Sequence, residues 1–113
     1  RFHEPRRGDI VIVQPGDSSI TLVKRVIGLP GETIESKNGH TYINGKAIDE
    51  PWVANFGGRY QAPTLIPEGY VFIIGDNRPI SHDSRAIGPV SIEDIEGRVI
   101  FVYWPLTEIA FFP

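Results

Sequence analysis

The stretch TIESKNGHTYINGK, residues Thr33–Lys46, contains two Asn-Gly pairs, Asn38-Gly39 and Asn44-Gly45. Asn-Gly between short apolar runs is the strongest short-range signal for a β-hairpin, because both residues tolerate the positive φ angles of a tight turn. Short runs of strand-forming residues, Thr33–Ser36 and His40–Ile43, flank the first pair. The stretch therefore predicts a meander of short antiparallel strands.

Short apolar runs separated by turn residues continue on both sides of this meander. Helical periodicity is nearly absent, and only Ile92–Glu96, after an N-cap at Ser91, is predicted to form a helical turn. Prolines and glycines break the pattern from Glu50 to Glu68, which predicts a long loop. The remaining runs predict strands at Gly8–Gln14, Thr21–Ile27, Tyr70–Ile74 and Arg98–Trp104.

The predicted fold class is mainly β, with antiparallel strands and hairpins and at most one or two short helical turns. A length of 113 residues suits a single domain, residues 1–113, with a real hydrophobic core. The 41% hydrophobic and 22% charged residues are typical of a globular rather than a disordered chain. A net charge of −3 argues against a nucleic-acid partner, which favours a concentrated positive surface.

Composition also limits the chemistry. The sequence has no cysteine, which excludes disulfides, thiol nucleophiles and thiolate metal sites, and its three histidines are scattered without metal-ligand spacing. We therefore predict no metal site and no cofactor. No apolar run reaches the roughly 18 residues of a membrane-spanning helix. The sequence begins at Arg1 without a methionine, from which we expect a piece of a longer protein.

One lysine, Lys24, lies inside the apolar stretch VKRVIGLPGE, residues Val23–Glu32. Strand alternation places it on one face with Leu22 and Val26. Removal from water disfavours the charged form of an amine, and a neutral amine can act as a general base. The pattern alone still favours an ordinary solvated lysine, because lysines are rarely buried.

A second dense stretch, GDNRPISHDSR at Gly75–Arg85, follows the apolar run Tyr70–Ile74. It contains two aspartates, two arginines and two serines. Exposed charges in a turn add little stability, and a loop serine such as Ser81 most often caps its own backbone. The interleaving of opposite charges nevertheless favours an ordered site at the end of a strand.

Three ordered motifs, Arg7–Val13 (RGDIVIV), Val23–Glu32 and Gly75–Arg85, resemble the three C-terminal sequence boxes of bacterial type I signal peptidases. The hairpin with its Asn-Gly turns is also similar to that family's layout, so the resemblance spans nearly the whole chain. It implies a membrane-anchored serine endopeptidase that removes signal peptides from exported preproteins. It also implies a Ser-Lys dyad on a signal-peptidase-like β fold, with the catalytic domain on the extracytoplasmic face of the cell membrane.

The resemblance further implies roles for individual residues. Lys24 would be the general base, and Ser81 would hydrogen-bond its amine. Ile12 and Val23 would line an apolar groove for small substrate side chains, where an extended substrate could pair with a strand. Four charged residues would brace the site as two ion pairs, Arg25 with Asp76 and Asp83 with Arg85.

One departure from the family pattern concerns the nucleophile. The family's Ser-Met-x-Pro box lies upstream of the Arg-Gly-Asp strand, and this sequence contains no methionine. We expect the anchor helix and the nucleophilic serine to lie outside residues 1–113, and this polypeptide alone to be inactive. A smaller departure is Glu32, which stands where the family most often has aspartate.

Two other functions remain open. A self-cleaving, repressor-type Ser-Lys peptidase shares the dyad and much of the β framework, although it lacks the Gly-Asp-Asn-Arg box present at Gly75–Arg78. A non-catalytic β module would bind extended peptides in the same groove without hydrolysis. Cleavage assays with the upstream segment restored, and with Lys24→Ala alongside, separate these functions.

Overall fold

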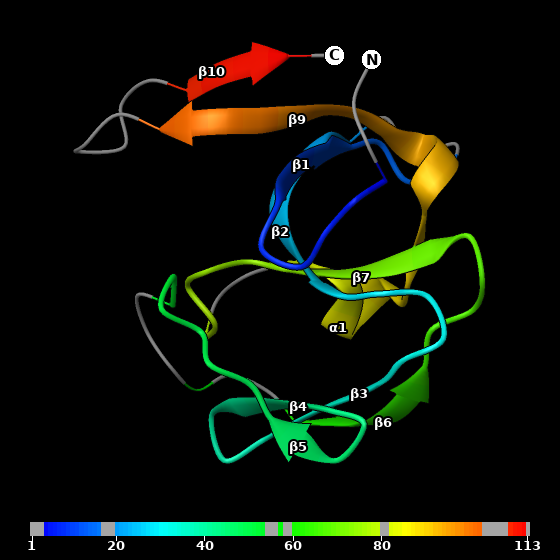
Figure 1. The fold of residues 1–113 in the computed structure, drawn as a ribbon, viewed down its shortest axis with the longest axis vertical. Coiled ribbons are helices and arrows are strands. Elements are labelled where there is room, and N and C mark those ends of the chain that lie inside the picture. Colours follow the sequence, from blue (N-terminus) through cyan, green and yellow to red (C-terminus); the bar gives the residue numbers. More distant parts are fainter. Residues whose placement is uncertain are drawn as a thin grey trace.

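The computed structural model describes residues 4–16, 20–53, 57, 60–79, 82–102 and 109–112, with backbone alone for 98–102 and 109–112. The described residues form two sheets in which the paired strands are antiparallel (Figure 1). The six-stranded sheet has the order β10 (Ile109–Phe112), β9 (Ile95–Val102), β1 (Ile10–Val13), β2 (Leu22–Gly28), β7 (Tyr70–Ile74), β8 (Val90–Ser91). The four-stranded sheet has the order β5 (Lys46–Ala47), β4 (His40–Ile43), β3 (Thr33–Lys37), β6 (Gln61–Leu65).

Two short helical segments accompany the strands. Helix α1 (Ser84–Ile87) contacts β7, and the 3₁₀ helix η1 (Ile92–Asp94) immediately precedes β9. The hydroxyl of Ser91 accepts a 3.2 Å hydrogen bond from the backbone N–H of Glu93, which is the predicted N-cap. The predicted fold class, mainly antiparallel β with one or two short helical turns, is confirmed.

Both Asn-Gly turns adopt the backbone conformation that hairpins favour. Asn38 and Gly39 have φ angles of 53° and 80°, and Asn44 and Gly45 have 52° and 85°. Positive φ at both central residues matches the right-handed twist of the flanking strands. The first turn joins β3 to β4 and the second joins β4 to β5, as the sequence predicts.

The core consists of two apolar clusters that share strands β2 and β7. Val26 and Ile73 belong to the first cluster, whereas Ile27 and Phe72 belong to the second. Because successive side chains of a strand point to opposite faces, β7 from Val71 to Ile74 and the end of β2 at Val26 and Ile27 are buried on both sides. This explains why the sequence of β7 reads as an unbroken apolar run.

Gly28 lies where β2 passes close to its neighbours. A Cβ atom added there would overlap Cδ1 of Ile66 and lie 3.0 Å from Cβ of Phe72. The pairing of β2 with β7 also shifts register between Val26 and Gly28. The glycine therefore permits a close packing of strands that any side chain would obstruct.

Two sequence predictions need correction. The stretch from Glu50 to Glu68 contains strand β6, which the prolines of that stretch obscured; Pro63 is tolerated because β6 lies at the edge of its sheet. The helical turn predicted at Ile92–Glu96 is shorter, because β9 already begins at Ile95. Ile95 pairs with Val13 of β1, so the end of the predicted turn belongs to the six-stranded sheet.

Candidate active site

Lys24 lies on β2, a central strand of the six-stranded sheet. The next residue, Arg25, pairs with Ile74, the last residue of β7. In an antiparallel pair, Lys24 therefore lies beside the point where the chain leaves β7 and enters Gly75–Arg85. Lys24 is half-buried, whereas the apolar residues two positions before and after it on the same face are buried.

Buried hydrogen bonds fix the second half of the Gly75–Arg85 segment to the end of β7. The backbone N–H of Ile73 donates to the Ser84 hydroxyl, and that of Gly75 donates to Oδ2 of Asp83, both at 2.9 Å. Asp83 also caps α1, because its Oδ1 accepts from the backbone N–H of Arg85 at 3.0 Å. Asp83 and Ser84 are 0% and 1% exposed, so water does not compete for these bonds.

Two bidentate ion pairs join the four charged residues singled out in the sequence. Nε and Nη2 of Arg85 lie 3.0 Å from the two carboxylate oxygens of Asp83, with both side chains buried. Nε and Nη2 of Arg25 lie 3.0 and 2.8 Å from the carboxylate oxygens of Asp76, in a partly exposed position. The structure thus brings together the expected partners, and their role in bracing a catalytic site stays a prediction.

Further contacts connect the three sequence motifs to one another. Arg25 of the second motif binds Asp76 of the third and donates at 2.8 Å to the carbonyl of Gly8 in the first. Arg7 of the first motif donates two hydrogen bonds of 2.8 and 2.7 Å to the carboxylate of Glu32 in the second. These bonds from Arg7 lower the pKa of Glu32 and raise the pKa of Arg7.

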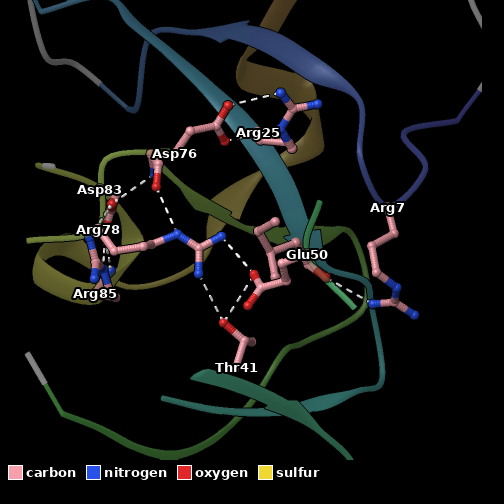
Figure 2. A network of polar contacts seen from close by, with 10 residues as sticks. Arg7, Arg25, Thr41, Glu50, Asp76, Arg78, Asp83 and Arg85 are labelled. Carbon is pink, nitrogen blue, oxygen red and sulfur yellow. Dashed lines mark hydrogen bonds and ion pairs between the residues drawn. The ribbon is translucent and has the colours of Figure 1, made fainter. Parts of the chain in front are cut away.

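Sequence reasoning missed a buried cluster around Arg78 that joins the two sheets (Figure 2). Nη2 of Arg78 lies 2.7 Å from Oε2 of Glu50, and Nη1 donates at 3.0 Å to the hydroxyl of Thr41 on β4. Nε donates at 2.8 Å to the carbonyl of Gly75. The Arg78 and Glu50 side chains are 3% and 1% exposed. Glu50 lies in a stretch without periodicity, so no sequence signal marked it.

The proposed groove residues lie side by side, and one proposed dyad residue falls outside the described ranges. Ile12 of β1 pairs directly with Val23 of β2; Ile12 is half-buried and Val23 is 42% exposed. Ser81 lies outside the described residues. A separate apolar pocket of about 170 Å³ includes Leu22, on the same strand face as Lys24. Its lining residues are Pro15, Ile20, Leu22, His82, Ile87 and Val90.

Within the described ranges, no group of three or more His, Cys, Asp or Glu residues is arranged to hold a metal ion. Among the helices of those ranges, none is long and apolar enough to cross a membrane.

The fold and the site define a mainly β protein whose half-buried lysine adjoins a charged segment held by buried hydrogen bonds. The sequence profile described as "Signal peptidase, peptidase S26" matches residues 1–104, and the chain belongs to this family.

Individual relatives agree with this assignment. Signal peptidase I of Bacillus caldolyticus is 41% identical, over 94% of this chain and 65% of its own length. Signal peptidase I of Bacillus amyloliquefaciens is 42% identical, over 94% of this chain and 61% of its own length. A crystal structure of a signal peptidase I from Enterococcus faecalis V583 is similar with a TM-score of 0.73 and 33% identity, covering 88% of this chain and 99% of that one. The chain therefore spans less than two thirds of the length of these two curated relatives.

Proposed function

We propose that these residues form the core of a signal peptidase I, a serine endopeptidase that removes signal peptides from exported preproteins. Lys24 is the general base of a Ser-Lys dyad, and the Ser81 hydroxyl hydrogen-bonds its amine. The Arg25–Asp76 and Asp83–Arg85 ion pairs brace the site. The whole protein is anchored in the cell membrane, with these residues on the extracytoplasmic face.

The placement of Lys24 carries this proposal. The lysine is half-buried on a central strand, beside a segment whose Asp83 and Ser84 side chains are bonded to the backbone of β7. A catalytic group acts best when rigid elements and surrounding hydrogen bonds hold it in one geometry. Lys24 has this support from its own strand and from the end of β7.

The proposed chemistry transfers one proton in each direction. The Lys24 amine takes the proton of a serine hydroxyl as that oxygen attacks the scissile carbonyl, and the resulting ammonium returns the proton to the leaving amine. The 113 residues contain no Ser-Met-x-Pro box, because they contain no methionine. We propose that the nucleophile comes from outside these residues, which do not cleave on their own.

The substrate is proposed to lie extended along β2. Strand β7 ends opposite Arg25, so β2 continues for Leu22–Lys24 past the end of its neighbour. A peptide laid along this part of β2 would form backbone hydrogen bonds and reach Lys24. The adjacent Ile12 and Val23 would contact its small apolar side chains.

Preprotein cleavage by the full-length gene product tests the proposal. We expect Lys24→Ala to lower kcat/KM by roughly 1,000-fold, because general-base catalysis contributes about 10²–10⁴-fold. Lys46→Ala removes an exposed lysine of β5 and should leave the rate within about twofold, as expected for a solvated surface charge. The 113-residue chain alone should not cleave.

Two other outcomes of this assay would contradict the proposed function. Wild-type cleavage by a folded Lys24→Ala protein would remove the dyad mechanism. Signal-peptide binding by the full-length product without any turnover would instead favour a non-catalytic peptide-binding module.

A further inference from the structure

We infer that Glu50 is a positioning residue: through Arg78 it fixes the Gly75 carbonyl and thereby the backbone beside Lys24. This inference rests on the proposed function. It assigns to the four-stranded sheet, which supplies Thr41, a direct part in holding the active-site segment in place.

The first step is the geometry of the Arg78 guanidinium. Its three nitrogens donate in three directions, to Gly75 O at 2.8 Å, to Thr41 Oγ1 at 3.0 Å and to Glu50 Oε2 at 2.7 Å. The Thr41 hydroxyl in turn donates to the same Glu50 oxygen at 3.2 Å. Figure 2 shows Arg78 spanning the space between the segment after β7 and the Glu50–Thr41 pair. Its planar fork cannot move toward one partner without weakening the others.

The second step concerns Gly75, whose two backbone polar groups are both held by side chains. Asp83 accepts from the N–H at 2.9 Å, and Arg78 donates to the carbonyl at 2.8 Å. Gly75 follows Ile74, which pairs with Arg25, so it lies next to Lys24 across the strand pair. Release of Arg78 would free one of the two restraints on the backbone at that point.

The third step is energetic. Burial of two charges costs desolvation, and well-packed apolar residues of the same size are often equally or more stabilising than a buried ion pair. Net stability therefore gives no sufficient reason for the pair of Arg78 and Glu50, whose side chains are 3% and 1% exposed. Apolar side chains cannot hold the Gly75 carbonyl in one orientation, because they donate no hydrogen bond to it.

This reasoning predicts different results for two replacements. Glu50→Gln keeps the shape and an amide oxygen that accepts from Arg78, and its NH₂ can occupy the place of Oε1, a buried atom without a hydrogen-bond partner among the described residues. The double replacement Glu50→Met/Arg78→Met keeps bulk but removes the clamp, that is, the hydrogen bonds of Arg78 to Gly75, Thr41 and Glu50. The matched control is Glu35→Gln/Lys37→Gln, which removes a 4.0 Å ion pair on β3 of the same sheet.

The experiment measures kcat, KM and melting temperature for preprotein cleavage by the full-length gene product. We expect the folded Met/Met variant to lose at least tenfold in kcat, with KM changed less than threefold. Glu50→Gln should retain kcat within threefold, and the Glu35/Lys37 control should match the wild type.

Three results would overturn the inference. They are a wild-type kcat in the folded Met/Met variant, a failure of that variant to fold, and a loss in Glu50→Gln as large as in Met/Met. The first would show that the clamp is dispensable for cleavage. The second would show that the Arg78–Glu50 pair is needed for folding rather than for positioning. The third would show that the charge of Glu50 matters, rather than the direction of its hydrogen bond to Arg78. Failure of the proposed function is distinguishable, because it shows as absent cleavage by the wild type or unchanged cleavage by Lys24→Ala.

Discussion

Glu32 illustrates how one side chain fastens two motifs. Its carboxylate accepts two hydrogen bonds from Arg7 and one from the backbone N–H of Leu29, at 2.7–2.8 Å. Arg7 also donates to the carbonyl of Ile27 at 2.8 Å, so the turn after β2 is held against the first motif. The glutamate side chain thus reaches both terminal nitrogens of the Arg7 guanidinium in a bidentate arrangement.

Glu32→Gln should lower stability by about 1 kcal/mol at pH 7, the scale of a partly exposed ion pair with good geometry. Folding lowers the pKa of Glu32, so its stabilisation is fully present above the unfolded value near 4.5 and is lost as pH falls through the lower folded value. Urea denaturation at pH 7 and at pH 3 measures this difference. A gap between wild type and variant that widens in acid would contradict the assignment.

Two residues, Lys24 and Glu50, show what the sequence alone could and could not predict. Alternation placed Lys24 on a face with buried apolar neighbours, which the structure shows. Glu50 was unpredictable, because its partner Arg78 is 28 residues away and only the folded chain brings them together. Local pattern contains no information about such a long-range contact.

At the scale of elements, turn chemistry was the reliable signal. The two Asn-Gly pairs correctly predicted the β3–β4–β5 meander, since positive φ is a strictly local requirement. Strand β6 and helix α1 were missed. Strand β6 forms by pairing with β3, which is distant in the sequence. Helix α1 is only four residues long and depends on the Asp83 cap.

The close packing of β2 also belongs to this scale. Gly28→Ala should destabilise the protein by about 1–3 kcal/mol, the usual cost of an added methyl in a packed core. Ile66→Val removes the Cδ1 atom that the new methyl would overlap. Ile66→Val alone should cost about 0.5–1.5 kcal/mol, but much less in the Gly28→Ala background. Thermal unfolding of the four proteins measures the coupling, and strictly additive losses would rule out steric overlap as the cause.

At the scale of the whole molecule, three motifs separated in sequence meet at one place. Arg25 contacts both Gly8 and Asp76, and Arg78 joins the segment after β7 to the four-stranded sheet. The order of the motifs indicated the family from sequence alone, and the comparisons confirm it. Their spatial junction required the structure. The roles of Lys24, Ser81, Ile12 and Val23, and the single-domain extent 1–113, stay predictions.

The central claim is that the Lys24 amine meets the nucleophilic serine hydroxyl. The most direct measurement is the distance between Lys24 Nζ and that hydroxyl oxygen in an experimental structure of the full-length gene product. We predict a hydrogen-bonding separation of about 2.6–3.2 Å. A lysine that instead extends into solvent, with another side chain beside the serine, would contradict the account.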